Sequence, residues 1–298
     1  MSGFAGLEPA LADAGGTVSV WCGPVAGQPR FTRLAGAPHY PASTMKLAVL
    51  AAAYRLADAG TLDLDAPVEV HNDFGSAAPG AARFRMDPDY DSDPSVWARL
   101  GETASLRWLA RRMIVLSSNL ATNLVLEHTG YAAATAAWRA AAAVGPAGGA
   151  GAASSVVRRG IEDYAAREAG IDNLVTAADL AALLGAIATD RIASAAACHE
   201  MRQVLLAQEK NDDLPMGLPT GTPVAHKNGW VDGIRHDAAI VYPADAPAYL
   251  LVACLSTPSP DERMRQLMAR IAAASWAGRH RLDSPAGRAG WHRLDSQP

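Results

Sequence analysis

The chain has 298 residues, half of them hydrophobic, so it can form a substantial core in one large domain or two interleaved ones. Its net charge of −4 and pI near 6.1 come without a basic stripe, so we expect no nucleic-acid partner. No segment offers the roughly 18 uninterrupted apolar residues that span a bilayer, and the N-terminus lacks a basic leader before an apolar core. We expect no membrane partner and, for the sequence as written, a cytoplasmic protein, or a secreted one if a leader was removed.

Two stretches near the N-terminus have the composition of paired strands. Residues Thr17 to Gly23 (TVSVWCG) are rich in β-formers, and PRFTRLAG follows after a glycine-containing turn. This pattern predicts a hairpin. Residues Ser43 to Ala59 then have a helical pattern, and a segment rich in Pro, Gly and Asp, from Asn72 to Pro94, predicts a loop.

The middle of the chain has helical patterns, and strand patterns return in its last third. Helical patterning runs over 105–188, with breaks at Gly130 and at a flexible, glycine-rich connector, 145–151. After Pro223 come three β-rich runs, AHKNGWV, HDAAIVYP and AYLLVACLS, and a last helix over 260–276.

This order of elements predicts an α+β fold, in which both chain ends form an antiparallel sheet flanked by helices, with an all-helical domain inserted between them. We assign residues 1–57 and 205–279 to the sheet domain and 58–204 to the helical domain. Residues 280–298 repeat HRLDS among Gly, Pro and Arg, and we interpret them as a disordered tail.

The composition argues against metal and cofactor chemistry. Cys22, Cys198 and Cys254 are odd in number and far apart, which is typical of small buried hydrophobic side chains. The histidines show no H-x-x-x-H or H-x-H spacing, and no glycine-rich phosphate motif is present. We therefore expect no metal, no cofactor and a small-molecule substrate.

Lysine use is the first sign of chemistry. The chain has three lysines against twenty-three arginines, so a lysine suggests a task that arginine cannot perform. Ser43 and Lys46 lie one turn apart at the start of a predicted helix, where a lysine of lowered pKa could take the serine proton. The alternative is that Ser43 only caps the helix.

Two further stretches have both functional and structural interpretations. Lys227 lies on a predicted strand, in AHKNGWVDG, where it is either a second cation of the site or a surface lysine on an edge strand. Ser117, Ser118 and Asn119 interrupt two apolar helical runs, and taken alone they indicate a helix end followed by a cap.

Together these elements resemble a known family. Ser43-Thr44-Met45-Lys46, Ser117-Ser118-Asn119 and Lys227-Asn228-Gly229 resemble, in the same order, the S-x-x-K, S-D-N and K-T-G elements of class A β-lactamases and penicillin-binding proteins. The resemblance extends over about Leu7 to Trp276 and includes Thr176 to Leu184, which is similar to the helix after the family's Ω-loop. It implies a β-lactamase/transpeptidase-like fold.

The resemblance also implies roles for individual residues. Ser43 is the expected acylated nucleophile, Lys46 its proton acceptor and Ser117 a relay toward the leaving atom. The implied oxyanion hole is formed by the backbone N–H groups of Ser43 and Trp230. The implied substrate-binding residues are Asn119, which binds an amide side chain, Lys227, Asn228, Gly229 and Arg235, which binds a carboxylate unless it is a solvated arginine at the strand end.

Departures from the family pattern affect deacylation most. The family's E-x-x-L-N pattern, whose glutamate activates water, is absent from SSVVRRGIEDYAAREAGIDNLVT. Glu162 is our first choice for that base, with Asp163 and Glu168 as alternatives and a solvated helix carboxylate as the structural interpretation of each. Asn228 replaces a hydroxyl, Ser118 replaces the aspartate of S-D-N, and Trp230 can narrow the acyl pocket or stack on a substrate.

The sequence leaves three functions open, because one fold supports many activities. The leading hypothesis is a serine hydrolase that forms an acyl-enzyme on Ser43 and hydrolyses a β-lactam amide. The second is an esterase, amidase or D-peptidase acting on a small metabolite. The third is a penicillin-binding or sensor module whose Ser43 adduct persists.

Overall fold

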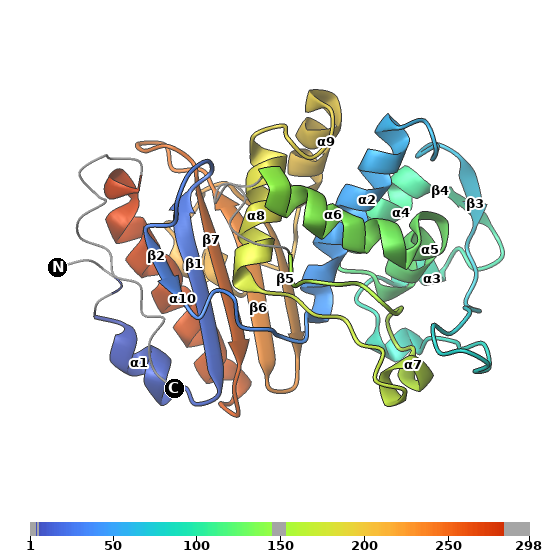
Figure 1. Ribbon diagram of the computed structural model, residues 1–298, viewed down its shortest axis with the longest axis horizontal. Helices are drawn as coiled ribbons and strands as arrows, with labels where there is room; N and C mark the ends of the chain where they lie inside the picture. Colours follow the sequence, from blue (N-terminus) through green and yellow to red (C-terminus); the bar gives the residue numbers. More distant parts are fainter. Residues whose placement is uncertain (1–3, 5, 145–152, 283–298) are drawn as a thin grey trace.

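The computed structural model describes residues 4, 6–144 and 153–282, and its centre is a five-stranded antiparallel sheet. The strands are β1 (Thr17–Pro24), β2 (Phe31–Arg33), β5 (Val224–Val231), β6 (Ile234–Val241) and β7 (Tyr249–Ser256), in the order β2-β1-β7-β6-β5. The N-terminal hairpin therefore pairs with the C-terminal strands, β1 against β7, as Figure 1 shows. The predicted fold class is confirmed.

Both faces of the sheet are buried, and the alternation along β7 shows how. Leu250, Val252 and Cys254 face one hydrophobic cluster, while Leu251 and Ala253 face the other. The first cluster is shared with the helices of the middle of the chain, and the second with α1 (Glu8–Asp13) and α10 (Asp261–Gly278). A strand buried on both faces needs a continuous apolar run, and AYLLVACLS supplies one.

The helices of the middle of the chain pack around one buried helix, α2 (Lys46–Asp58), whose first nine residues are all buried. Around it lie α4 (Leu106–Val115), α5 (Asn119–Thr129), α6 (Tyr131–Val144), α8 (Ala177–Ala188) and α9 (Ala195–Leu206), with the short helices α3 (Pro94–Trp97) and α7 (Tyr164–Glu168) farther out (Figure 1). The middle of the chain also contains a two-stranded antiparallel pair, β3 (Pro67–Glu69) with β4 (Thr103–Ser105).

Some elements differ from the predictions. Helices α1 and α9 and the β3–β4 pair were not predicted, although Ser194 is a recognisable cap that accepts a hydrogen bond from the backbone N–H of Ala197. The glycine-rich connector at 145–152 and the tail from residue 283 onward lie outside the described residues. The first two residues of the predicted tail, His280 and Arg281, belong to a short 3-10 helix, Arg279–Arg281.

The structure bears on the predictions for the cysteines and for membrane-spanning segments. Cys22, Cys198 and Cys254 are all buried and unbridged. Among the helices that the structure describes, none is long and apolar enough to cross a membrane.

Candidate active site

A cleft of about 1080 Å³ lies where the edge strand β5 meets the start of α2 and the helical region. Five of the sequence-predicted site residues line it: Ser43, Ser117, Asn119, Glu162 and Trp230. Lys46, Lys227 and Asn228 are fully buried behind that surface. Tyr90, Ile161 and Asp261 also line the cleft.

Ser43 lies in a 3-10 turn, Ala42–Met45, that leads directly into α2. No side-chain bond caps that turn, so the capping interpretation of Ser43 does not describe its hydroxyl. The turn packs against β5 at Gly229, where an added Cβ would lie 2.5 Å from the backbone nitrogen of Ser43 and 3.0 Å from that of Thr44. Only glycine allows the strand this close to the backbone of Ser43.

Lys46 is the first residue of α2, is fully buried and contacts the α4–α5 junction. Its Nζ lies 2.7 Å from the carbonyl oxygen of Ser117, 2.8 Å from Oδ1 of Asn119 and 3.2 Å from Oγ of Ser117. Burial, followed by the positive charge of Lys227, holds the pKa of Lys46 well below its usual range, and the nearby carboxylate of Asp91 acts in the opposite direction.

These three contacts fit a neutral amine. A neutral lysine has two N–H donors and one lone pair, and two of the partners, a backbone carbonyl and an amide oxygen, can only accept. The third partner, the Ser117 hydroxyl, can donate to the lone pair. An ammonium satisfies the same partners with three donors, so the contacts suit both forms, and the lowered pKa of Lys46 favours the neutral one, which can receive a proton.

Lys227 is also fully buried, which a surface lysine on an edge strand is not. Its Nζ donates to the carbonyl oxygen of Asn228 at 2.7 Å and lies 3.3 Å from Oδ1 of the same residue. Burial lowers the pKa of Lys227 to about 7, despite the opposing charges of Asp237 and Asp213. The charge of Lys227 is therefore sensitive to pH near neutrality.

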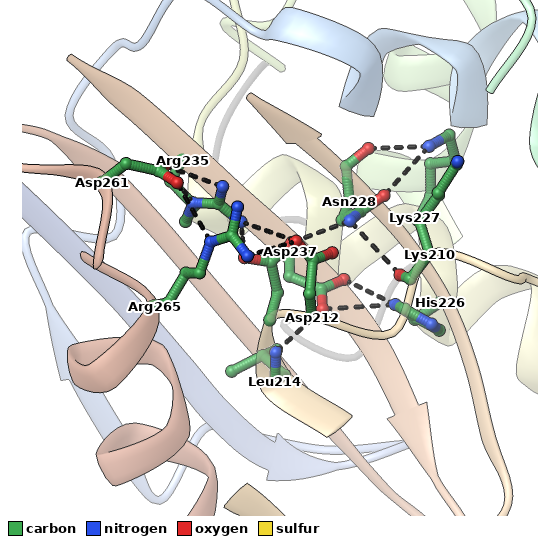
Figure 2. Close-up of polar contacts among 11 residues, drawn as sticks. Lys210, Asp212, Leu214, His226, Lys227, Asn228, Arg235, Asp237, Asp261 and Arg265 are labelled. Carbon is green, nitrogen blue, oxygen red and sulfur yellow. Dashed lines mark hydrogen bonds and ion pairs between the residues drawn. The ribbon is translucent and has the colours of Figure 1, made fainter. Parts of the chain in front are cut away.

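Arg235 lies within a buried ion-pair network rather than in solvent, and its side chain is 1% exposed. Its guanidinium donates to Asp213 at 2.5 Å and to Asp261 at 2.7 Å and 2.9 Å. Asp213 also accepts from Nδ2 of Asn228 at 2.7 Å, so the network continues toward the site. Figure 2 labels Arg235, Asp261 and Asn228. The charge of Arg235 is thus matched within the protein, and its predicted contact with a substrate carboxylate stays a prediction.

The segment between the connector and α8 carries the three candidate bases, and only Glu162 lines the cleft. Asp163 is buried, caps α7 and accepts hydrogen bonds from Ser76 Oγ at 2.6 Å and from the backbone of Ala77 at 2.7 Å. Glu168 is exposed on the far end of α7. The fold therefore separates three carboxylates that are indistinguishable in the sequence.

The carboxylate of Glu162 is held on one side only. Its Oε2 accepts from the backbone N–H of Asp87 at 2.8 Å, whereas its Oε1 is buried with no partner among the residues described. Burial raises the pKa of Glu162, and the negative charges of Asp87 and Asp91 add to this effect. A carboxylate oxygen of raised proton affinity that lacks a protein donor is suited to accept a proton from a water molecule.

Asn123 was missed by the sequence analysis, although it fixes the position of this segment. Its amide makes two hydrogen bonds of 2.9 Å to Ile161, donating to the carbonyl oxygen and accepting from the backbone N–H. Gly160 leaves room for this contact, since a Cβ there would lie 3.0 Å from Oδ1 of Asn123. The available signal was an asparagine four residues after Asn119, on the same face of α5.

Backbone strain is concentrated at the cleft. Five described residues other than glycine have a positive φ, and three of them line the cleft: Ala42 at 46°, Ser117 at 62° and Glu162 at 64°. Each such residue costs roughly 1 kcal/mol or more, and strain of this kind persists where the surrounding structure imposes it, often at functional sites.

Comparisons with known proteins agree with this architecture. A structure of PBP-A is 19% identical with a TM-score of 0.71, covering 88% of this chain and 89% of that one. A β-lactamase from Sphaerobacter thermophilus is 21% identical with a TM-score of 0.74, covering 92% and 97%. A β-lactamase from Chitinophaga pinensis is 19% identical with a TM-score of 0.75, covering 93% and 98%. These likenesses show the fold.

No curated protein sequence matches the chain. The model of the β-lactamase enzyme family matches residues 5–278, nearly the whole length. The chain therefore belongs to the β-lactamase enzyme family.

Proposed function

We propose that the chain is an active-site serine hydrolase that forms an acyl-enzyme on Ser43 with a β-lactam and releases it to water. The observation that carries the proposal is Lys46: a fully buried amine, satisfied in its neutral form, one turn from a cleft-lining serine. Its lowered pKa is what a proton acceptor for a serine hydroxyl requires near neutral pH.

Acylation is proposed as follows. Oγ of Ser43 bonds to the lactam carbonyl carbon while its proton passes to Nζ of Lys46. The carbon–nitrogen bond then breaks, and the leaving nitrogen takes the proton of the Ser117 hydroxyl, which Lys46 replaces across their 3.2 Å contact. The backbone N–H groups of Ser43 and Trp230, adjacent to Gly229, are the proposed donors to the developing oxyanion.

Deacylation is assigned to Glu162. Water bonds to the ester carbon as one of its protons passes to the carboxylate of Glu162. The bond between that carbon and Oγ of Ser43 then breaks, and Oγ takes the proton from Glu162, which returns the carboxylate and the serine to their starting forms. The raised pKa of the glutamate makes it a stronger base than an ordinary carboxylate, provided the pH exceeds that pKa.

A second candidate is a penicillin-binding module with slow release. The observation in its favour is that the cleft wall here offers few groups to bind a hydrolytic water. Oε2 of Glu162 already accepts from the backbone N–H of Asp87. The residue that Asn123 holds at the cleft wall, Ile161, has an apolar side chain. One similar solved structure, 18% identical with a TM-score of 0.75 and covering 93% of this chain and 95% of that one, is a PBP-A variant in an acyl-enzyme complex with penicillin G.

Intact-protein mass spectrometry with time-resolved product detection distinguishes these functions. The protein is mixed with a chromogenic cephalosporin and, separately, with an activated ester, beside a Ser43→Ala control. We expect a transient Ser43 adduct and continuing cephalosporin turnover. A persistent cephalosporin adduct supports the binding module, turnover of the ester alone supports an esterase, and an equal adduct on Ser43→Ala contradicts the proposal.

A further inference from the structure

We propose that Asp91 is a positioning residue that fixes Ser117 and Asn119 against Lys46. The S-D-N element has an aspartate where this chain has Ser118, and Asp91 supplies the missing carboxylate from a loop that is distant in the sequence. The loop containing Asp91 lies before α3, and nothing in its sequence marks it as part of the site. Its kinetic consequence rests on the proposed function, whereas its effect on Lys46 can be measured without any turnover.

The loop containing Asp91 contacts the start of α5. Oδ2 of Asp91 accepts from the backbone N–H of Leu120 at 2.8 Å and from the Ser118 hydroxyl at 3.1 Å. The carbonyl oxygen of Tyr90 accepts from Nδ2 of Asn119 at 2.8 Å. Two consecutive loop residues therefore bind three consecutive residues, the last two of the motif and Leu120 after them.

These contacts orient the groups that bind Lys46. With its Nδ2 held by Tyr90, the amide of Asn119 presents Oδ1 to Nζ of Lys46 at 2.8 Å. Ser117 precedes the helix with φ at 62°, a conformation that its neighbours must hold in place. A carboxylate at the N-terminus of α5 also interacts favourably with the helix dipole, which strengthens this clamp.

A serine at position 118 depends on such a partner. Its hydroxyl accepts from the backbone N–H of Ala121 at 3.1 Å and is fully buried, so it caps α5 and leaves the N–H of Leu120 to another acceptor. Asp91 is that acceptor. An aspartate at position 118 would place the negative charge within the motif itself. In this chain the charge belongs to Asp91, which precedes Ser118 by 27 residues.

The charge of Asp91 also acts on the Lys46 amine. Lys46 contacts the α4–α5 junction, and the charged groups that act on it are Lys227, which disfavours protonation, and Asp91, which favours it. Burial is the larger effect. Asp91 thus acts against burial and Lys227, the two influences that lower the pKa of Lys46.

The three-lysine composition makes this effect directly measurable. Lysine labelled with ¹³C at the ε-carbon gives one NMR signal each for Lys46, Lys210 and Lys227, assigned with Lys210→Arg. Titrations would compare the pH midpoint of the Lys46 signal in the wild type, in Asp91→Asn and in the exposed neighbour Asp89→Asn. Each would be repeated in a Lys227→Met background, because removing that cation raises the Lys46 midpoint. We expect Asp91→Asn to lower that midpoint by about 0.5 to 1 pH unit and Asp89→Asn to leave it within about 0.2.

A double variant that moves the carboxylate from position 91 to position 118 separates the effect of the charge from an effect on folding. Asp91→Asn with Ser118→Asp should restore both the Lys46 midpoint and the rate of Ser43 acylation, and it carries the test if Asp91→Asn alone does not fold. An unchanged midpoint in Asp91→Asn, equal shifts in both asparagine variants, or a double variant that fails to recover would overturn the role of Asp91. If wild-type Ser43 is never acylated, the proposed function fails while the NMR result still decides on Asp91.

Discussion

A β-carbon on Gly229 would lie 2.5 Å from the backbone nitrogen of Ser43, a separation that real β-carbons essentially never show. The edge strand and the turn that contains Ser43 are therefore in direct backbone contact, and the S-x-x-K-like and K-T-G-like motifs meet at this point. The contact also sets the spacing of the two proposed oxyanion donors, because Trp230 directly follows Gly229.

We expect Gly229→Ala to reduce the rate of acylation by about 100-fold to 1,000-fold, the effect of losing one oxyanion donor. The methyl group must push the turn at Ser43 away from β5. Acylation is measured by stopped-flow with a chromogenic cephalosporin. Gly36→Ala is the matched control, because a Cβ at Gly36 meets nothing within 4 Å, and equal rates in the two variants would contradict the proposed geometry.

Lys46→Arg should retain the positive charge and lose nearly all acylation, by about 100-fold to 10,000-fold. The reason is that a guanidinium does not give up its proton near neutral pH. Lys210→Arg is the control at the lysine outside the motifs. Adduct formation is followed by mass spectrometry, and an active Lys46→Arg enzyme would disprove the role of Lys46 as proton acceptor.

Lys227 should bind a substrate carboxylate in a pH-dependent manner. Its pKa is lowered to about 7, so the amine is charged below that pH and loses its charge as the pH rises through it. KM for a carboxylate-bearing substrate should therefore increase above pH 7, whereas KM for a neutral ester should not. Lys227→Ala should remove this difference, and a wild-type KM profile that is the same for both substrates would leave Lys227 without its role.

Glu162→Gln should preserve acylation and slow deacylation, so that the Ser43 adduct accumulates. The raised pKa of Glu162 means that the folded state disfavours its charged form, so stability falls as the pH rises through the unfolded and then the folded pKa. At neutral pH the glutamine variant should therefore melt no lower than the wild type. Glu168→Gln is the exposed control, and unchanged release in Glu162→Gln would exclude the glutamate as the base.

Arg235→Met should destabilise the protein by about 3 to 5 kcal/mol, because it leaves the buried Asp213 without its cation. Urea unfolding measures this, with Arg263→Met on the exposed side of α10 as the control. We expect kcat/KM to fall equally for carboxylate and neutral substrates. A loss confined to the carboxylate substrate would instead show that Arg235 binds the substrate directly.

The sequence alone determined the class of fold and the motif residues. Helical and strand periodicities are local, so strands at both ends with helices between them were enough to predict the sheet and its composition. The rarity of lysine likewise singled out Lys46 and Lys227, and both are fully buried.

Only the tertiary structure decided which of similar residues can act. Glu162, Asp163 and Glu168 look alike in the sequence, yet one lines the cleft, one tethers a loop and one is exposed. Arg235 is matched by Asp213 and Asp261, and Asp91 and Asn123 belong to the site through contacts spanning 29 and 38 residues. The physical reason is that burial, ion pairing and hydrogen bonding depend on neighbours in space, and those neighbours come from segments whose separation in the chain carries no periodic signal.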